Sequence, residues 1–177
     1  KIANFNTSCY NETAAAIRQL KEAGATKLIF DVRFNGGGYA SELVKVLDYL
    51  LPEGDLFRTV RYDRKEHTDT SDKDFLDIPM VVLVNKDSYS AAEFFAAALR
   101  EYDAARVVGE QTCGKGYFQQ TFDLSDGSAV SLSVGKYYTP KGVSLADVGI
   151  TPDVEVPVDD DTFLEIYYGN LEPEEDP

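Results

Sequence analysis

Apolar residues along the first two thirds of the chain are arranged in two different patterns. Segments with apolar residues every three or four positions predict amphipathic helices, and short uninterrupted apolar runs predict strands that are buried on both faces. The predicted helices are residues 13–23, 39–51 and 91–102, and the predicted strands are residues 2–5, 27–32, 56–62, 79–84 and 105–108. This alternation of helix and strand predicts an α/β domain.

The last third of the chain has strand-like alternation. Residues 117–124 and 128–138 flank the turn signal Ser125-Asp126-Gly127, which predicts a C-terminal β-hairpin. Residues 63–74 are almost wholly charged or polar without periodicity, and they predict a mobile surface excursion. The acidic, proline-containing residues 172–177 predict a disordered tail.

The composition narrows the class of partner. The chain has 177 residues, of which 44% are hydrophobic, which suits one compact domain with a core. Its formal net charge of −14 argues against nucleic acid or an anionic membrane as the main partner, because both favour clusters of Lys and Arg. The sequence has no apolar stretch of the roughly 18 to 20 residues that a membrane-spanning helix needs.

Histidine and cysteine offer little chemistry in this sequence. The single histidine, His67, lies in the most polar segment and is interpreted as a solvated surface residue, so a Ser-His-Asp triad is not expected. No G-x-S-x-G motif is present either. Cys9 and Cys113 are too few for a disulfide framework and lack the spacing of zinc ligands. We therefore expect neither a metal nor an organic cofactor.

Two loop segments that follow predicted strands are candidates for a site. One contains Ser90 at the start of a predicted helix, where free backbone N–H groups favour developing negative charge, although Ser90 could equally be a plain helix cap. The other contains Lys115 between two glycines, which could equally be a surface turn. Loops beyond the carboxyl ends of strands meet in the ligand crevice of open α/β sheets, so these residues could meet there. A lysine base must lose its proton, which requires either substantial desolvation or a nearby cation. Val107, Val108 and Phe118 are candidates for an apolar pocket.

Five segments in order along the chain carry a resemblance to a known family. They are DVRFNGGG at 31–38, LVN at 83–85 with SYSAAE at 88–93, VGEQTCGKGYFQ at 108–119, LSDGS at 124–128, and YYTP at 137–140 with GITPD at 149–153. Together they resemble the carboxyl-terminal processing peptidases, also called tail-specific proteases, which are related to the core of tricorn protease.

The resemblance implies a fold, a reaction and a set of site residues. It implies an α/β fold of the Clp-protease/crotonase-like type, with buried strands, flanking helices and the C-terminal hairpin. It implies a serine peptidase in which Ser90 is the nucleophile and Lys115 the general base, with Gln119 orienting the lysine amine. The backbone N–H groups of Gly37 or Gly38 and of Ala91 would hold the oxyanion.

The sequence also departs from the family pattern. Tyr89 and Ala92 replace small residues around the nucleophile, and Gly36 replaces a loop proline. Tyr89 could therefore narrow the pocket. Glu93 matches the family glutamate and is interpreted as structural, and Glu101 is interpreted as a helix-surface carboxylate.

The resemblance also bears on domains, partners and location. We expect a catalytic core over residues 1–168 and an acidic tail over residues 169–177, in a fragment that lacks the PDZ module of most family members. The implied partner is a polypeptide substrate, cleaved near its C-terminal region, and the implied location is extracytoplasmic. An oligomer is left open. The competing hypotheses are a non-catalytic ligand- or peptide-binding module on the same fold, and acyl-CoA chemistry, which the acidic composition disfavours.

Overall fold

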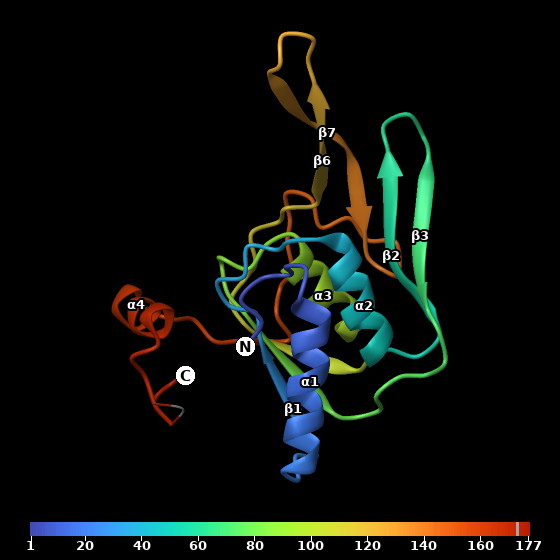
Figure 1. Cartoon of the computed structure of the whole chain (residues 1–177). Helices are drawn as coiled ribbons and strands as arrows, with labels where there is room; N and C mark the ends of the chain where they lie inside the picture. Colours follow the sequence, from blue (N-terminus) through green and yellow to red (C-terminus); the bar gives the residue numbers. More distant parts are fainter. Residues whose placement is uncertain (173) are drawn as a thin grey trace.

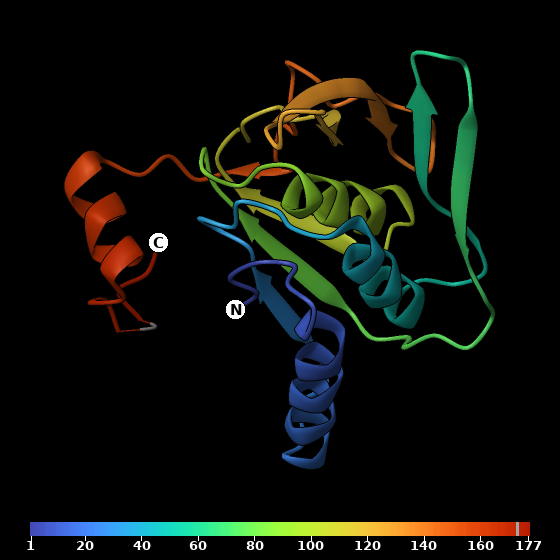
Figure 2. The same cartoon turned by 45° about the horizontal axis from the view of Figure 1, so that its top comes forward.

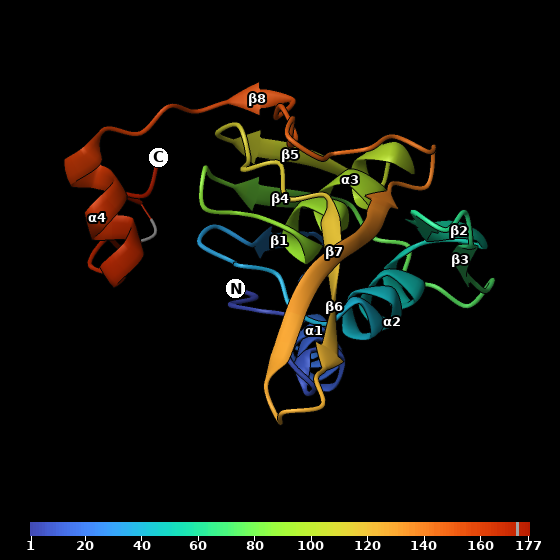
Figure 3. The same cartoon turned by 90° about the horizontal axis from the view of Figure 1, so that it is seen from above.

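Two four-stranded sheets organise the chain, seen here in a computed structural model that describes residues 1–172 and 174–177. One sheet is parallel with the order β1-β4-β5-β8, and the other is antiparallel with the order β3-β2-β7-β6 (Figures 1 and 3). The strands are β1 Leu28–Asp31, β2 Gly54–Arg61, β3 Glu66–Ser71, β4 Met80–Val84, β5 Ala105–Gly109, β6 Tyr117–Asp123, β7 Ala129–Tyr138 and β8 Val154–Glu155. The helices are α1 Cys9–Glu22, α2 Ala40–Leu50, α3 Ala91–Glu101 and α4 Asp160–Tyr168.

Helix α3 lies between the two sheets and is the centre of the core. Its residues from Ala91 to Leu99 are all buried, which is the pattern of a helix covered on every side. Phe94 packs against Phe57 of β2, with ring centroids 5.2 Å apart, and Phe95 packs against Phe30 of β1 at 5.4 Å. Consecutive phenylalanines therefore bind opposite layers, which fixes the position of the amino end of α3.

The structure confirms the mixed α/β architecture and the hairpin of β6 and β7. Two local predictions in the first half of the chain were wrong. Residues 63–74 are not an irregular excursion, because β3 pairs with β2 in a second hairpin that projects beside the first (Figure 1). Residues 2–5 do not form a strand, since Phe5 makes an isolated bridge to Gly38. Hydrophobic periodicity missed β3 because its side chains are mostly polar and its stability comes from backbone pairing.

Helix α4 was not predicted, and it occupies a distinct place. It lies beyond the carboxyl ends of the parallel strands, away from α1, α2 and α3 (Figures 2 and 3). The tail was predicted to be disordered, but Asp176 forms an ion pair with Arg33 beside the end of β1. Pro173 lies outside the described residues. None of the helices in the described ranges is both long and apolar enough to cross a membrane.

Replacement of Gly149 by alanine tests the packing of the segment that precedes β8. A Cβ at this position would lie 2.5 Å from the backbone oxygen of Thr112, at a positive φ of 73°. Gly169 has nearly the same φ, 70°, with nothing within 4 Å, and is a matched control. We expect Gly169→Ala to lower the unfolding free energy by about 1 kcal/mol from backbone strain alone. Gly149→Ala should cost roughly 2 kcal/mol more because backbone atoms must move.

Urea denaturation of the two variants gives both values directly. Equal losses would show that the Thr112 contact is relieved without cost, and that the segment is loosely packed.

Candidate active site

Ser90 lies in a strained turn between β4 and α3. Its φ of 59° and ψ of −123° are unusual for a residue with a side chain, and such strain persists where the surrounding structure enforces it. Ser88 has a different environment. Its hydroxyl is fully buried, donates to the Val32 carbonyl at 2.8 Å and accepts from the Asn85 N–H at 3.0 Å. The Ser88 hydroxyl is therefore used in hydrogen bonds that hold the loop. Ser90, in contrast, is half-buried at the start of α3.

A fully buried carboxylate, that of Glu93, joins the Ser90 turn to the Lys115 loop. Its Oε2 accepts from the backbone N–H groups of Ser90 at 2.9 Å and of Lys115 at 2.8 Å. Its Oε1 accepts from the Gly114 N–H at 2.7 Å and from the Thr112 hydroxyl at 2.6 Å. The Ser90 and Lys115 backbones, 25 positions apart in sequence, are thus bound to one oxygen atom.

Thr112 extends this network toward β8. Its Oγ1 donates to Glu93 and accepts from the Ile150 N–H at 2.7 Å. Sequence reasoning interpreted Glu93 as structural, which the geometry supports, but it missed Thr112. Glutamate three residues after a helix-capping serine is a known capping pattern, and that signal was available for Glu93. A threonine in a loop gives no comparable signal.

The glycine loop at residues 35–38 packs directly on the Ser90 turn. A Cβ at Gly37 would lie 2.7 Å from the Ser90 Cβ and 3.1 Å from the Ala91 nitrogen. The Gly37 N–H donates to the buried Asn35 Oδ1 at 2.8 Å, so it is already bonded. In the described ranges, the N–H groups of Gly38 and Ala91 have no such partner. Of the three N–H groups that the family resemblance suggests for the oxyanion, those of Gly38 and Ala91 are therefore free to donate a hydrogen bond.

Lys115 is exposed, and its amine lies 5.3 Å from the centre of the Tyr89 ring. The apolar enclosure expected from Val107, Val108 and Phe118 is not seen around an exposed side chain, and Phe118 instead stacks on Tyr137 at 5.0 Å. A cation over an aromatic face is stabilised in its charged form. In this arrangement the Lys115 side chain faces solvent beside the Tyr89 ring.

Gln119 is also exposed, on β6. The pairing of β6 with β7 shifts register between Phe118 and Gln119. The pairing skips Val134, so the extra residue lies in β7, and Lys115 itself precedes β6, which begins at Tyr117. The even spacing from Lys115 to Gln119 therefore does not by itself place the two side chains on one face.

Tyr89 and Gly36, which both depart from the family pattern, are in contact and have complementary sizes. The Tyr89 hydroxyl would lie 2.7 Å from a Cβ placed at Gly36, so the glycine leaves room for the tyrosine. Tyr89 thus occupies space beside the glycine loop and under the Lys115 amine. It forms a wall of the candidate site.

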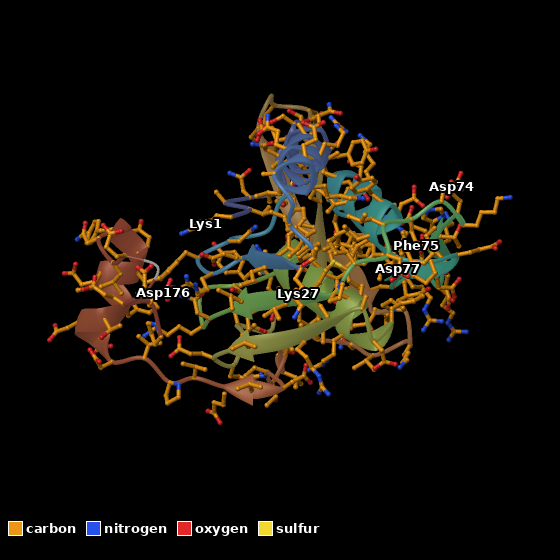
Figure 4. All side chains as sticks on the ribbon, turned by 90° about the horizontal axis from the view of Figure 1, so that it is seen from below. Lys1, Lys27, Asp74, Phe75, Asp77 and Asp176 are labelled. Carbon is orange, nitrogen blue, oxygen red and sulfur yellow. The ribbon has the colours of Figure 1, made fainter. Side chains whose placement is uncertain are left out.

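The remaining candidates have structural or surface roles. Glu101 accepts from the Thr139 hydroxyl and the Lys141 N–H, both at 2.7 Å, and ties the end of α3 to the loop after β7. His67 is exposed on β3 and bonds to Asp69. A cleft of about 620 Å³ is lined by Phe75 and Asp77, among other residues, near the amino ends of β4 and β5. Figure 4 shows Phe75 and Asp77 on the opposite side of the molecule from Asp176. The cleft is lined by Met80 at the start of β4 and by Arg100 near the end of α3, whereas Ser90 immediately precedes α3, so the cleft and Ser90 lie at opposite ends of that helix.

The segments that carry these features match a known family over most of the chain. Residues 1–156 match Peptidase family S41. The chain belongs to peptidase family S41. This confirms the resemblance drawn from the five motif segments.

Relatives of this S41 chain are considerably longer than the chain itself. It is 38% identical over 161 residues to the carboxyl-terminal-processing protease of Synechocystis sp.. That alignment covers 89% of this chain and 38% of that protein. It is 34% identical over 156 residues to carboxyl-terminal-processing peptidase 1, chloroplastic, of Arabidopsis thaliana, covering 86% of this chain and 32% of that protein.

Solved structures agree with these sequence matches. The photosystem II D1 C-terminal processing protease aligns with a TM-score of 0.81 at 36% identity, covering 87% of this chain and 40% of that one. Tricorn protease aligns with a TM-score of 0.61 at 19% identity, covering 95% of this chain and 16% of that one. The tricorn match shows a shared fold.

Replacement of Glu93 by glutamine tests the network that joins the two loops. Glutamine offers one acceptor oxygen and places an NH₂ donor against N–H donors, so buried groups lose their partners. We expect Glu93→Gln to lower the unfolding free energy by about 3 kcal/mol.

Glu101→Gln is the control, because Glu101 lies on the same helix, accepts two hydrogen bonds and is half-buried. It should cost about 1 kcal/mol in the same denaturant titration. Similar losses for both variants would contradict a special role for the Glu93 carboxylate.

Proposed function

We propose that this chain is the catalytic core of a serine peptidase of the carboxyl-terminal processing type, with Ser90 as nucleophile and Lys115 as general base. The observation that carries the proposal is the Glu93 carboxylate, which binds the backbone of both residues and holds their loops together. The strained turn at Ser90 supports the same assignment. Membership of family S41 supplies the reaction class.

In the proposed reaction, the neutral Lys115 amine takes the proton of the Ser90 hydroxyl as Oγ attacks the scissile carbonyl carbon. The carbonyl π electrons move to oxygen, and the unoccupied N–H groups of Gly38 and Ala91 donate to that oxyanion. Collapse of the tetrahedral intermediate breaks the C–N bond, and Lys115 returns the proton to the leaving amine. Water then hydrolyses the acyl-enzyme by the same route in reverse.

The exposure of Lys115 sets a condition on this reaction. The Lys115 amine is exposed beside the Tyr89 ring, and only an unprotonated amine can accept the Ser90 proton. We propose that a bound polypeptide covers Lys115 and removes part of its hydration, so that Lys115 accepts the Ser90 proton more readily with substrate than without it. Gln119 would then orient the amine if β6 adjusts on binding.

The proposed substrate is a polypeptide that is cleaved near its C-terminal region. This proposal rests on the names of relatives such as the D1 processing protease, together with the charge of this chain, which does not favour nucleic acid. An extracytoplasmic location, a Clp-protease/crotonase-like fold and substrate delivery by a PDZ module are part of the same proposal. The alternative is a binding module on the same fold, and the exposure of Lys115 is the observation that favours it.

Labelling with a serine-directed fluorophosphonate distinguishes the two functions. We expect a single adduct on Ser90 in the intact protein, and no adduct on the Ser90→Ala variant. Ser88→Ala is the control and should still be labelled, because the Ser88 hydroxyl is engaged with Val32. Equal labelling of wild type and Ser90→Ala by intact mass would remove Ser90 from the mechanism. Absence of any adduct, with and without a peptide, would favour the binding module.

Replacement of Lys115 by arginine tests the base. Arginine stays protonated, so Lys115→Arg should lower the labelling rate of Ser90 by about 100-fold or more while preserving charge. Lys136→Arg is a matched control, because the Lys136 amine also lies over a tyrosine ring, at 5.1 Å from Tyr117. It should label at the wild-type rate. Retained labelling by Lys115→Arg would point to a different base.

A further inference from the structure

Residues beyond the family match make close contacts with the loops that carry the candidate site. The match to family S41 ends at residue 156, whereas α4 and Asp176 follow it. Figure 4 shows Asp176 on the side of the C-terminal segment that faces Lys1 and the body of the molecule. We call α4 together with Asp176 the C-terminal latch.

The strongest contact of the latch is an ion pair between Asp176 and Arg33. Nη1 and Nη2 of Arg33 donate to the two carboxylate oxygens of Asp176, each at 2.6 Å. The same guanidinium donates from Nε and Nη2 to Asp31 at 3.0 Å. The Arg33 side chain is 12% exposed and that of Asp176 is 28% exposed, so this pair is shielded from water more than a surface ion pair is. The bonds from Arg33 lower the pKa of Asp176, and those from Asp176 raise the pKa of Arg33.

The second contact involves Phe34, the next residue of the glycine loop. Phe34 has a positive φ of 62°, which is costly for a residue with a side chain. Its ring packs edge to face on Phe163 at 4.8 Å and on Tyr167 at 5.2 Å, both from α4. Its N–H donates to Asn85 at 3.0 Å. The strained conformation of Phe34 is therefore held from one side by α4 and from the other by the loop after β4.

The third contact reaches the loop that leads to Ser90. The Lys86 amine lies 4.1 Å from the centre of the Phe163 ring. Phe163 thus touches both the glycine loop and the residue after Asn85. One aromatic side chain of the latch contacts the two segments whose relative position defines the site.

A short series of contacts connects Phe34 to Ser90. The next residue, Asn35, is fully buried and accepts from the Gly37 N–H through its side chain. Its carbonyl accepts from the Tyr89 N–H at 3.1 Å. Gly37 itself lies against the Ser90 Cβ. A change in the backbone at Arg33 or Phe34 would therefore shift the position of the proposed oxyanion donors, which lie only a few residues away.

We propose that Asp176 and Phe163 are positioning residues, which act through Arg33 and Phe34 to hold the glycine loop against the Ser90 turn. This inference rests on the proposed peptidase function for its catalytic consequence. Its structural part, the ordering of residues 33–38, does not depend on Ser90 or Lys115 being catalytic.

Hydrogen exchange of the whole chain tests the structural part. The amides of Phe34, Asn35 and Gly37 all donate hydrogen bonds in the loop and report its opening. We expect Asp176→Asn and Phe163→Ala each to speed their exchange roughly tenfold, which corresponds to loss of one charge-assisted or aromatic contact. Amides in the middle of β4 and α3 should exchange as in wild type. Asp161→Asn is the control on α4, since in the described ranges the Asp161 carboxylate touches neither loop.

The fluorophosphonate rate at Ser90 tests the catalytic part in the same variants. We expect labelling to slow severalfold in Asp176→Asn, to recover in Asp176→Glu, and to stay at the wild-type rate in Asp161→Asn. Faster labelling in Asp176→Asn would overturn the proposal and indicate that the latch obstructs the site. Unchanged exchange at residues 34–37 in both Asp176→Asn and Phe163→Ala would also overturn it. If wild type is not labelled at all, the peptidase function fails, and exchange measured in the Ser90→Ala background still decides whether the latch orders the loop.

Discussion

The candidate site depends on the need of one buried carboxylate for hydrogen-bond donors. Glu93 has no contact with water, and a charge in that position is stable only when both oxygens are bonded. Four donors from the Ser90 turn and the 112–115 loop meet that need. Because the two loops come from different strands, satisfying the carboxylate forces them into one place. The geometry of the candidate site is therefore a consequence of burying Glu93 in α3.

The burial of α3 between the sheets is what keeps Glu93 away from water. Phe94 and Phe95 bind the antiparallel and parallel layers, and the small alanines beside them allow both sheets to approach the helix. The start of α3 is then fixed in three dimensions. The loops that reach it from β1 and β5 need only be the right length to meet the Glu93 carboxylate and the Ser90 turn.

The sequence predicted the parts of this arrangement that have a periodic or motif signature. Buried strands, the three core helices and the hairpin after Lys115 follow from hydrophobic spacing, and Ser90 and Lys115 follow from the family motifs. Strand β3 has mostly polar side chains, and its pairing is made by backbone atoms that composition does not reveal. The contact of Arg33 with Asp176 joins positions far apart in the chain, and neither residue has a neighbour pattern that marks it. The exposure of Lys115 likewise depends on the direction in which the chain enters β6, which the sequence does not reveal.

Three of the four donors to Glu93 are backbone N–H groups, at Ser90, Gly114 and Lys115. Any residue except proline supplies that group, so these three hydrogen bonds do not themselves require particular side chains at positions 90, 114 and 115. Replacing the Lys115 side chain would leave all four hydrogen bonds to Glu93 in place. The buried carboxylate sets the shape of the 112–115 loop, whereas the side chain at position 115 sets the chemistry that the loop presents.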